Sequence, residues 1–301
     1  MPTQLPMAVL GGEALAPLQF LPAVAVALVY AVRVRTLRGT TSQVPGWRQA
    51  CMFGGLLLAV FAVGGLGGTA GELFTVHMAE HLMIGDLGTL LIALGLTGPV
   101  LAPVLRLPVI DRLQFLLNPV VAFLLWAGNL YLWHLPSLHE AAVGNDLVHV
   151  VQHAGFVFFG VNMWLALLGP LPKPAWFGNA AQLGYIFAVR ITGAILGNVL
   201  VFGRPFYDVY DPGRADWNIG ATADQAAAGG LMMVEGSLLT IGLLAWLFLK
   251  IARQSDERQE LVELAREHGV ELSSRRAARA VAAGRGDELR RRILAGAPTA
   301  G

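Results

Sequence analysis

Five histidines stand at the ends of apolar stretches, and four of them form two His-x-x-x-His pairs. The pairs are His77 with His81 and His149 with His153, and His134 closes a further apolar stretch. Residues four apart in a helix differ by about 40° around its axis, so each pair presents both imidazoles on one face. Neutral imidazole is the commonest protein ligand for metals and suits copper, zinc and iron. The pattern predicts a metal or cofactor site.

The composition is that of a protein embedded in a membrane. Of the 301 residues, 55% are hydrophobic and 14% are charged, which is too apolar for a soluble domain of this size. Apolar stretches near the length of a bilayer crossing occur at 18–32, 50–66, 73–96, 119–135, 147–168, 183–201 and 226–249. We therefore expect an all-α integral membrane protein, a bundle of seven transmembrane helices. We interpret the first stretch as a retained helix, because no basic segment or small-residue cleavage pattern marks it as a signal peptide.

Basic side chains fall in every second connection between these stretches. They are Arg33, Arg35, Arg38, Arg48, Arg106, Arg112 and Lys173, followed by the arginine-rich segment after Lys250. The alternate connections hold Glu72, Glu140 and Asp146, and then a loop of mixed charge. Its segment 205–220 could act as a lid over the site or a docking surface, or be only a loop at the membrane interface. The positive-inside rule then predicts an outside N-terminus and a cytoplasmic C-terminus. In this topology both histidine pairs and His134 lie at the outer side of the membrane.

The composition changes at residue 251, which predicts two domains. Residues 1–250 form the membrane domain, and residues 251–301 form a charged cytoplasmic tail. We expect tail helices at 254–268, from a cap at Ser273 or Ser274 to about Ala283, and at 286–294. The arginines at 290–292 could touch anionic lipid. The net charge of +1 says little about partners, and we expect no nucleic-acid partner. The single Cys51 excludes an internal disulfide.

Further polar residues lie near the predicted site. Asp224 opens the last stretch at the level of the histidines, where it could cap its own helix or belong to the site. Met78 carries a thioether, a ligand type that selects Cu(I), although methionine is also common core filler. We expect His139, in an outer connection, and His268, in the tail, to be solvated.

Three charged residues fall at mid-membrane depth. Asp86, Arg190 and Glu235 lie inside the third, sixth and seventh stretches. Charges at this depth are rare and normally pair within the bundle. Asp86 is nine residues beyond His77, which is about 13 Å deeper and half a turn around a regular helix. We therefore predict a buried Asp86–Arg190–Glu235 network separate from the histidines and chiefly structural, with a proton or ion path as the alternative.

Four blocks of the sequence resemble the signature blocks of the CtaG family. They are 76–83 (VHMAEHLM), 132–136 (LWHLP), 149–153 (HVVQH) and Asp224-Gln225 followed by Gly229-Gly230, and the resemblance covers about 18–250. CtaG proteins are multi-span bacterial plasma-membrane proteins needed to assemble caa-type cytochrome c oxidase. The resemblance implies delivery of copper to the copper centre of a haem–copper oxidase, with an oxidase subunit and an extracytoplasmic copper donor as partners. Asp86 departs from the family pattern, in which its helix is apolar.

We predict that His77, His81, His149 and His153 bind one or two copper ions, with His134 and Asp224 completing or orienting the site. Copper delivery by ligand exchange needs no nucleophile, so we do not expect an enzyme. The main alternative is a transmembrane haem b protein with one axial histidine from each pair. A single haem would leave one histidine of each pair without a role, which favours a metal. A metal-dependent membrane hydroxylase or hydrolase, with Glu80 as base, is a third hypothesis.

Overall fold

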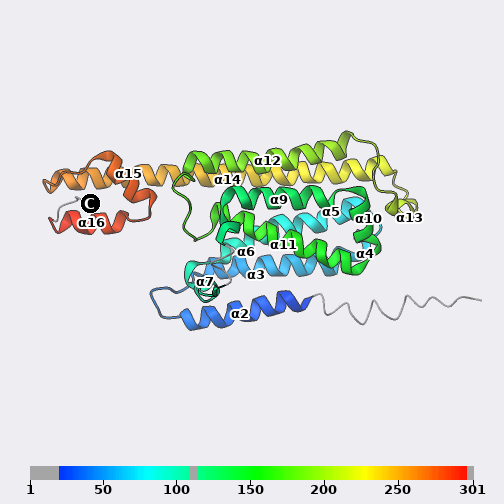
Figure 1. Ribbon diagram of the computed structural model, residues 1–301, viewed down its shortest axis with the longest axis horizontal. Helices are drawn as coiled ribbons and strands as arrows, with labels where there is room; N and C mark the ends of the chain where they lie inside the picture. Colours follow the sequence, from blue (N-terminus) through cyan, green and yellow to red (C-terminus); the bar gives the residue numbers. More distant parts are fainter. Residues whose placement is uncertain (1–19, 109–113, 297–301) are drawn as a thin grey trace, which may run out of the picture. The chain divides into compact units, whose positions relative to one another are not determined.

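The computed structural model describes residues 20–108 and 114–296, and the regular elements in these ranges are all helices (Figure 1). Before the gap they are α2 (Leu21–Leu37), α3 (Gly46–Phe61), α4 (Gly67–Ala70), α5 (Phe74–Leu82), α6 (Thr89–Gly95) and α7 (Gly98–Leu105). After it they are α9 (Pro119–Trp133), α10 (Pro136–Gly144), α11 (Asp146–Leu168), α12 (Asn179–Phe202), α13 (Asp211–Asp216), α14 (Ala221–Glu267), α15 (Ser274–Ala282) and α16 (Gly286–Leu294). Leu18, where the first predicted span begins, and Arg112 lie outside the described residues.

Five helices are long and apolar enough to cross a membrane. They are Gly46–Ala70, Phe74–Gly95, Asp146–Leu168, Asn179–Phe202 and Ala221–Glu267. The shorter helices α9, with 15 residues, and α2, with 17, occupy the two remaining predicted positions. Each apolar stretch of the sequence therefore coincides with a helix, and the predicted all-α membrane class is confirmed.

Two of the long helices contain π-helical turns. The segment η2 (Ala62–Leu66) joins α3 to α4, and η3 (Met83–Gly88) joins α5 to α6. A π turn inserts an extra residue and rotates everything that follows it. Asp86 lies within η3, so the regular-helix spacing that we used to place it half a turn from His77 does not hold. Such turns are frequent at functional sites.

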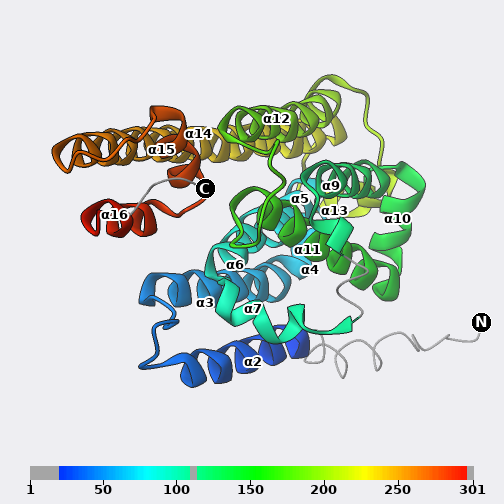
Figure 2. The ribbon, with the colours of Figure 1, turned by 60° about the vertical axis from the view of Figure 1, so that its left-hand side comes forward.

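A close helix contact sets the position of α11. This helix packs against α9 and α6, and in Figures 1 and 2 it runs beside α5 and α9. At Gly160 a Cβ atom would collide with the Gly85 carbonyl oxygen and would lie 2.8 Å from the Thr89 hydroxyl oxygen. Only glycine permits this approach, which is a common device where membrane helices meet. It brings α11 against η3, directly after the His77–His81 pair.

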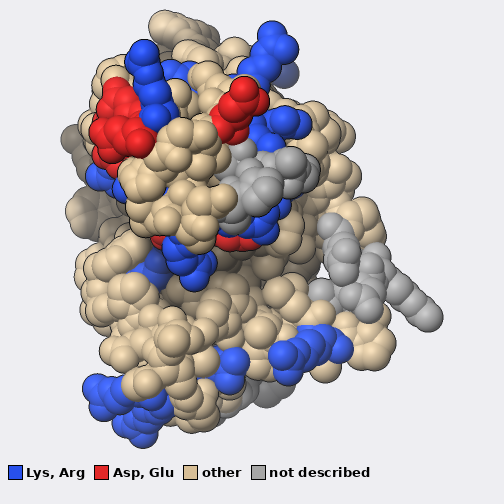
Figure 3. Space-filling model, turned by 90° about the vertical axis from the view of Figure 1, so that its left-hand side faces the viewer, with Lys and Arg blue, Asp and Glu red and all other residues tan. Residues whose placement is uncertain are grey.

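The chain divides into two compact units, Met1–Pro174 with Val189–Gly236, and Ala175–Ala188 with Ser237–Gly301. The first unit contains all the predicted site residues. Its basic side chains near the α2–α3 connection bind helix ends: Arg33 donates to the Pro99 carbonyl at 2.8 Å, and Arg48 to the Leu94 carbonyl at 2.8 Å. In the lower part of Figure 3, the α2–α3 side, the charged side chains in view are basic.

The second unit contains the tail, which has a small hydrophobic core of its own. The core residues are Leu261, Ala265, Ala277, Val281, Leu289 and Ile293. The expected cap of the second tail helix is present, because the Ser273 hydroxyl accepts the Arg276 N–H at 3.3 Å at the start of α15. The helix predicted at 254–268 is not separate, since α14 continues without a break to Glu267.

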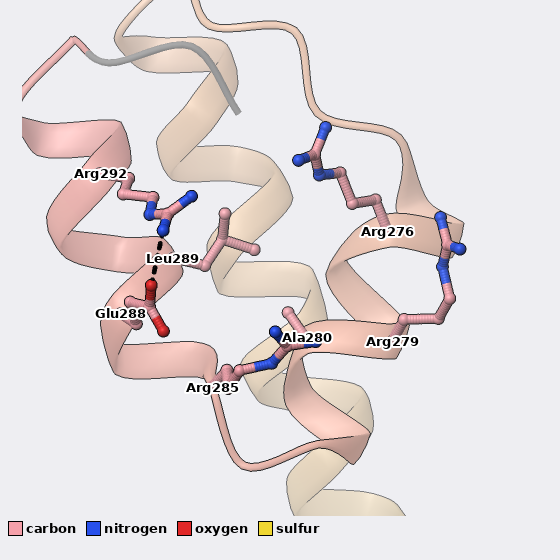
Figure 4. Close-up of a pocket in the computed structure, with 7 residues that line it drawn as sticks. All are labelled: Arg276, Arg279, Ala280, Arg285, Glu288, Leu289 and Arg292. Carbon is pink, nitrogen blue, oxygen red and sulfur yellow. Dashed lines mark hydrogen bonds and ion pairs between the residues drawn. The ribbon is translucent and has the colours of Figure 1, made fainter. Parts of the chain in front are cut away.

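A shallow pocket of about 200 Å³ lies between α15 and α16 (Figure 4). Arg276 and Arg279 line it from α15, and Arg285 and Arg292 line it from the α16 side. Arg292 is paired with Glu288 at 2.7 Å. Of the arginines that we expected to touch lipid, Arg290 also has a carboxylate partner, Glu260 at 2.8 Å. The ion pairs do not test whether these arginines contact lipid, so lipid contact by the tail stays a prediction.

Candidate metal centre

The two histidine pairs face one another across α5 and α11. The ring centroids are 4.3 Å apart within the His77–His81 pair and 4.1 Å apart within the His149–His153 pair. Between the helices, His77 lies 5.3 Å from His149, and His81 lies 5.3 Å from His153. The structure therefore gathers the four histidines of the two pairs into one cluster. We call these four residues, together with Glu80, the histidine cluster.

The histidine cluster contains two groups of potential metal ligands. One nitrogen each of His77, His81 and His149 lie within 4.8 Å of one another. The second group contains a Glu80 oxygen and one nitrogen each of His149 and His153, and these atoms also lie within 4.8 Å of one another. Metal–nitrogen bonds of about 2 Å place ligand atoms up to about 4 Å apart, so modest side-chain rotations bring either group onto an ion.

Within the described part of the chain, the polar atoms of the histidine cluster are buried without hydrogen-bond partners. They include Nε2 of His77, His149 and His153, both ring nitrogens of His81 and both carboxylate oxygens of Glu80. Leaving a buried polar group unpaired costs about 1–3 kcal/mol, so native proteins rarely do it. An ion bound by these nitrogens and oxygens would satisfy them together. The donor set, imidazole with one carboxylate, fits a transition-metal ion.

The start of each helix is fixed by a cap. The Asn145 side chain accepts the Leu147 N–H at 3.0 Å and caps α11 about one turn before His149 and about two turns before His153. The helix α5 has no cap of its own. Instead the Asp224 carboxylate, from α14, accepts the N–H groups of Phe74 and Thr75, each at 2.9 Å. Asp224 thus positions the helix that carries the first histidine pair.

Arg214 completes this arrangement from the loop between α12 and α14. Its Nε donates to Asp224 at 3.1 Å, and both side chains are buried. Its Nη1 donates to the Tyr207 carbonyl at 3.0 Å and to Asp211 at 3.0 Å. The sequence left open whether Asp224 caps a helix or belongs to the site. The structure shows that it caps a different helix from its own and pairs with a residue that the sequence did not single out.

The expectation that His139 is solvated is wrong. The connection after Pro136 folds as α10, which packs against α11 and buries His139 to 1% exposure. Its ring lies 4.8 Å from that of His77, and its Nε2 hydrogen-bonds with the Tyr210 hydroxyl at 2.8 Å. Burial lowers the pKa of His139 to about 3, so the ring is neutral at physiological pH. His139 links the histidine cluster to the loop above it.

His134 lies at the edge of this arrangement. Its Nδ1 donates to the Leu130 carbonyl at 2.7 Å, which leaves the Nε2 lone pair free, and Nε2 has no partner. Its ring lies 6.4 Å from that of His139, and its own carbonyl accepts the Tyr207 hydroxyl at 2.9 Å. His134 is therefore placed to orient the surroundings of the histidine cluster. Met78 is buried on α5, one position beyond His77.

The three membrane charges come from η3, α12 and α14. The charges of Asp86 and Arg190 both act on the Glu235 carboxyl group. The Arg190 guanidinium also donates to the Met233 carbonyl at 3.5 Å. Trp164 of α11 donates to the Asp86 carbonyl at 3.2 Å. Asp86 belongs to neither of the ligand groups.

A family model described as "Cytochrome c oxidase caa3 assembly factor (Caa3_CtaG)" matches residues 28–254. The match takes in both histidine pairs, His134, His139 and Asp224. This chain belongs to the CtaG family of caa3 assembly factors. The family resemblance of the sequence blocks is thereby confirmed, and the histidine cluster lies within the matched region.

Three mycobacterial proteins are similar to this CtaG-family chain. "Uncharacterized protein Mb0105" of Mycobacterium bovis and "Uncharacterized protein MT0111" of Mycobacterium tuberculosis are each 26% identical over 255 residues, 77% of this chain and 38% of theirs. "Uncharacterized protein ML1998" of Mycobacterium leprae is 25% identical over 245 residues, 74% of this chain and 36% of its own. The chain thus spans less than half the length of these relatives. No solved structure matches it.

Proposed function

We propose that this CtaG-family protein binds copper in its histidine cluster and delivers it to the copper centre of a haem–copper oxidase. Membership of a family of cytochrome c oxidase assembly factors supplies the biological setting. The single observation that supports a metal cargo is the set of buried, unpartnered imidazole nitrogens on α5 and α11. Neutral imidazoles suit copper, and copper is the metal that such an oxidase must acquire besides its haem iron.

The proposal includes a topology of seven crossings with the N-terminus outside. Helices occupy the positions of all the predicted spans, and α2 and α9 would be the two short crossings. The basic residues of alternate connections support a cytoplasmic C-terminus in the bacterial plasma membrane. In this orientation the histidine cluster lies in the outer half of the bilayer. An extracytoplasmic copper donor could then load it.

Copper fits the geometry better than haem. A bis-histidine haem needs the macrocycle between its two axial imidazoles. The rings of His77 and His149 are stacked with centroids 5.3 Å apart, and those of His81 and His153 are as close. No macrocycle fits between rings at this spacing. The clustering of all four rings instead favours a single small ion shared among them.

Delivery requires only an exchange of ligands. An ion held by neutral imidazoles can pass to the histidines of an oxidase copper centre as each protein–copper bond is replaced by another. The mechanism uses no nucleophile and no turnover, so the proposal does not make this protein an enzyme. It requires that an oxidase subunit reaches the outer half of the bilayer beside α11.

The test is the metal content of the oxidase in bacteria that lack this protein. The cells would be complemented with the wild-type chain, with the His77→Ala/His149→Ala double variant, or with His268→Ala. His268 is an exposed tail histidine and serves as the matched control. We expect the double variant to give oxidase that keeps its haem but lacks copper, and His268→Ala to behave as wild type.

Two results would contradict the proposal. Full copper occupancy with the double variant would show that the histidine cluster does not supply the metal. Loss of haem and copper together, with degradation of the oxidase polypeptide, would indicate a scaffold for the oxidase rather than a copper carrier.

A further inference from the structure

The two ligand groups of the histidine cluster differ in chemistry although they share His149. The inner subsite, made by His77, His81 and His149, contains imidazoles alone. The outer subsite, made by Glu80, His149 and His153, adds a carboxylate. Only the second group can neutralise the charge of a bound cation. The difference between the two subsites is therefore one of charge as well as ligand type.

The subsites also differ in access. His77 is 1% exposed and His81 is 4% exposed, so the inner subsite is enclosed. His149 is only half-buried, and the His153 side chain is 16% exposed. The His153 Nε2 lies 3.7 Å from the Glu80 carboxylate, too far for a hydrogen bond. Inner and outer here describe exposure and not depth in the membrane, and an ion that approaches past the partly exposed His149 and His153 meets the outer subsite first.

We propose that a single copper ion occupies these subsites in turn and remains bound to His149 as it moves between them. This inference rests on the proposed copper-carrier function and adds the route that the copper takes. His149 belongs to both ligand groups, and a neutral imidazole has a free lone pair on only one of its two nitrogens, so it serves one ion at a time. The shared ligand thus makes the two subsites successive positions of one ion.

The step is a balanced exchange of ligands without a change in oxidation state. Bonds from copper to the Glu80 oxygen and to the His153 nitrogen break, and bonds to the His77 and His81 nitrogens form. The bond to His149 persists. Binding at Glu80 displaces any proton that the carboxyl group carries. Soft Cu(I) prefers imidazole to carboxylate, so the ion comes to rest in the inner subsite.

The role of Glu80 in this route can be separated from a simple electrostatic effect. Neither Glu80 oxygen has a hydrogen-bond partner, and the side chain is 1% exposed. If Glu80 acted only as a nearby negative charge, its removal would weaken copper binding and speed copper release. If it holds copper in transit, its removal closes the route and slows both loading and release. The two effects have opposite signs.

The experiment measures how fast bathocuproine disulfonate removes Cu(I) from the full-length protein in detergent. The variants are Glu80→Gln, His153→Ala and His81→Ala, with Asp216→Asn as a control at an exposed carboxylate. We expect Glu80→Gln and His153→Ala to bind one copper and to release it about tenfold more slowly than wild type. Asp216→Asn should match wild type. His81→Ala should hold copper about tenfold or more weakly and release it faster.

Faster or unchanged release from both Glu80→Gln and His153→Ala would overturn the route. Binding of two copper ions by the wild type, with one lost in each subsite variant, would also overturn it, because the subsites would then be filled together. Binding of no copper by the wild type would contradict the copper-carrier function itself. By contrast, a wild type that binds one copper ion, with variants that release it at an unchanged rate, would contradict the route but not the copper-carrier function.

Discussion

The carboxylate of Asp224 caps the helix that begins at Phe74, accepting the Phe74 backbone N–H at 2.9 Å. These residues are 150 positions apart in the chain. The helix that presents His77 and His81 is thus held at its start by the last membrane helix. Because Arg214 neutralises the same carboxylate, one buried ion pair joins α5, α14 and the loop over the histidine cluster.

Replacing Asp224 with alanine should destabilise the whole first unit. It would leave the buried Arg214 charge without its main partner and the first N–H groups of α5 without acceptors. Loss of one member of such a pair costs about 3–5 kcal/mol. Denaturant unfolding in detergent would measure the loss, with Asp216→Ala as an exposed control. A change of under about 1 kcal/mol, as at a typical surface site, would contradict the cap.

Gly160→Ala should separate α11 from η3 and weaken copper binding. The added Cβ would meet the Gly85 carbonyl and the Thr89 hydroxyl, both parts of a packed helix. Overpacking of this kind costs about 1–3 kcal/mol. Gly128→Ala in α9 is the matched control, because nothing lies within 4 Å of its added Cβ. Copper titration and thermal unfolding of the two variants test this. Equal copper affinity and equal unfolding temperature in Gly160→Ala and Gly128→Ala would show that the contact does not position the histidines.

Tyr210→Phe should loosen the loop over the histidine cluster without removing a metal ligand. It deletes the hydrogen bond to His139 and leaves a buried ring nitrogen unpaired, which costs about 1–3 kcal/mol. We expect a lower unfolding temperature with unchanged copper stoichiometry. Tyr131→Phe is the control, because its hydroxyl bonds the Thr192 carbonyl at an exposed position. Loss of copper in Tyr210→Phe would mean that the loop contributes directly to the site.

Arg190→Leu should reduce the yield of folded protein. The change removes the positive charge that acts on Glu235, so acidic groups would stand without compensation inside the membrane. We expect a loss of about 2 kcal/mol, below that of a fully buried pair because both side chains are partly exposed. Adding Glu235→Gln should restore part of the yield in size-exclusion chromatography. A wild-type yield from Arg190→Leu alone would show that these charges are not structural.

The convergence of the two histidine pairs could be predicted from the sequence. The spacing of four residues sets both rings of a pair on one helix face. The alternation of basic connections then predicts that His77 and His149 stand at the same side of the membrane. Both inferences use local rules of helix geometry and charge, which tertiary packing did not override. The same rules gave the cap at Ser273 in the tail.

The partners of the site could not be predicted in this way. Asp224 binds backbone groups that look the same in every sequence, so nothing marks Phe74 as its partner. His139 follows a proline in a short connection, a context that indicates a solvated loop. Its burial depends on how α10 packs against α11. The π turn at Met83–Gly88 likewise leaves no clear pattern in the sequence, so the regular-helix spacing used to place Asp86 does not hold there.

Metal analysis and a visible spectrum of the purified wild-type protein, beside the His77→Ala/His149→Ala variant, test the central claim most directly. The account predicts about one copper per chain, no Soret band, and no copper in the variant. A Soret band that disappears in the variant would make this a haem protein. Wild-type protein that binds neither copper nor haem would contradict a copper-carrying site and leave the buried imidazoles without the ligand proposed for them.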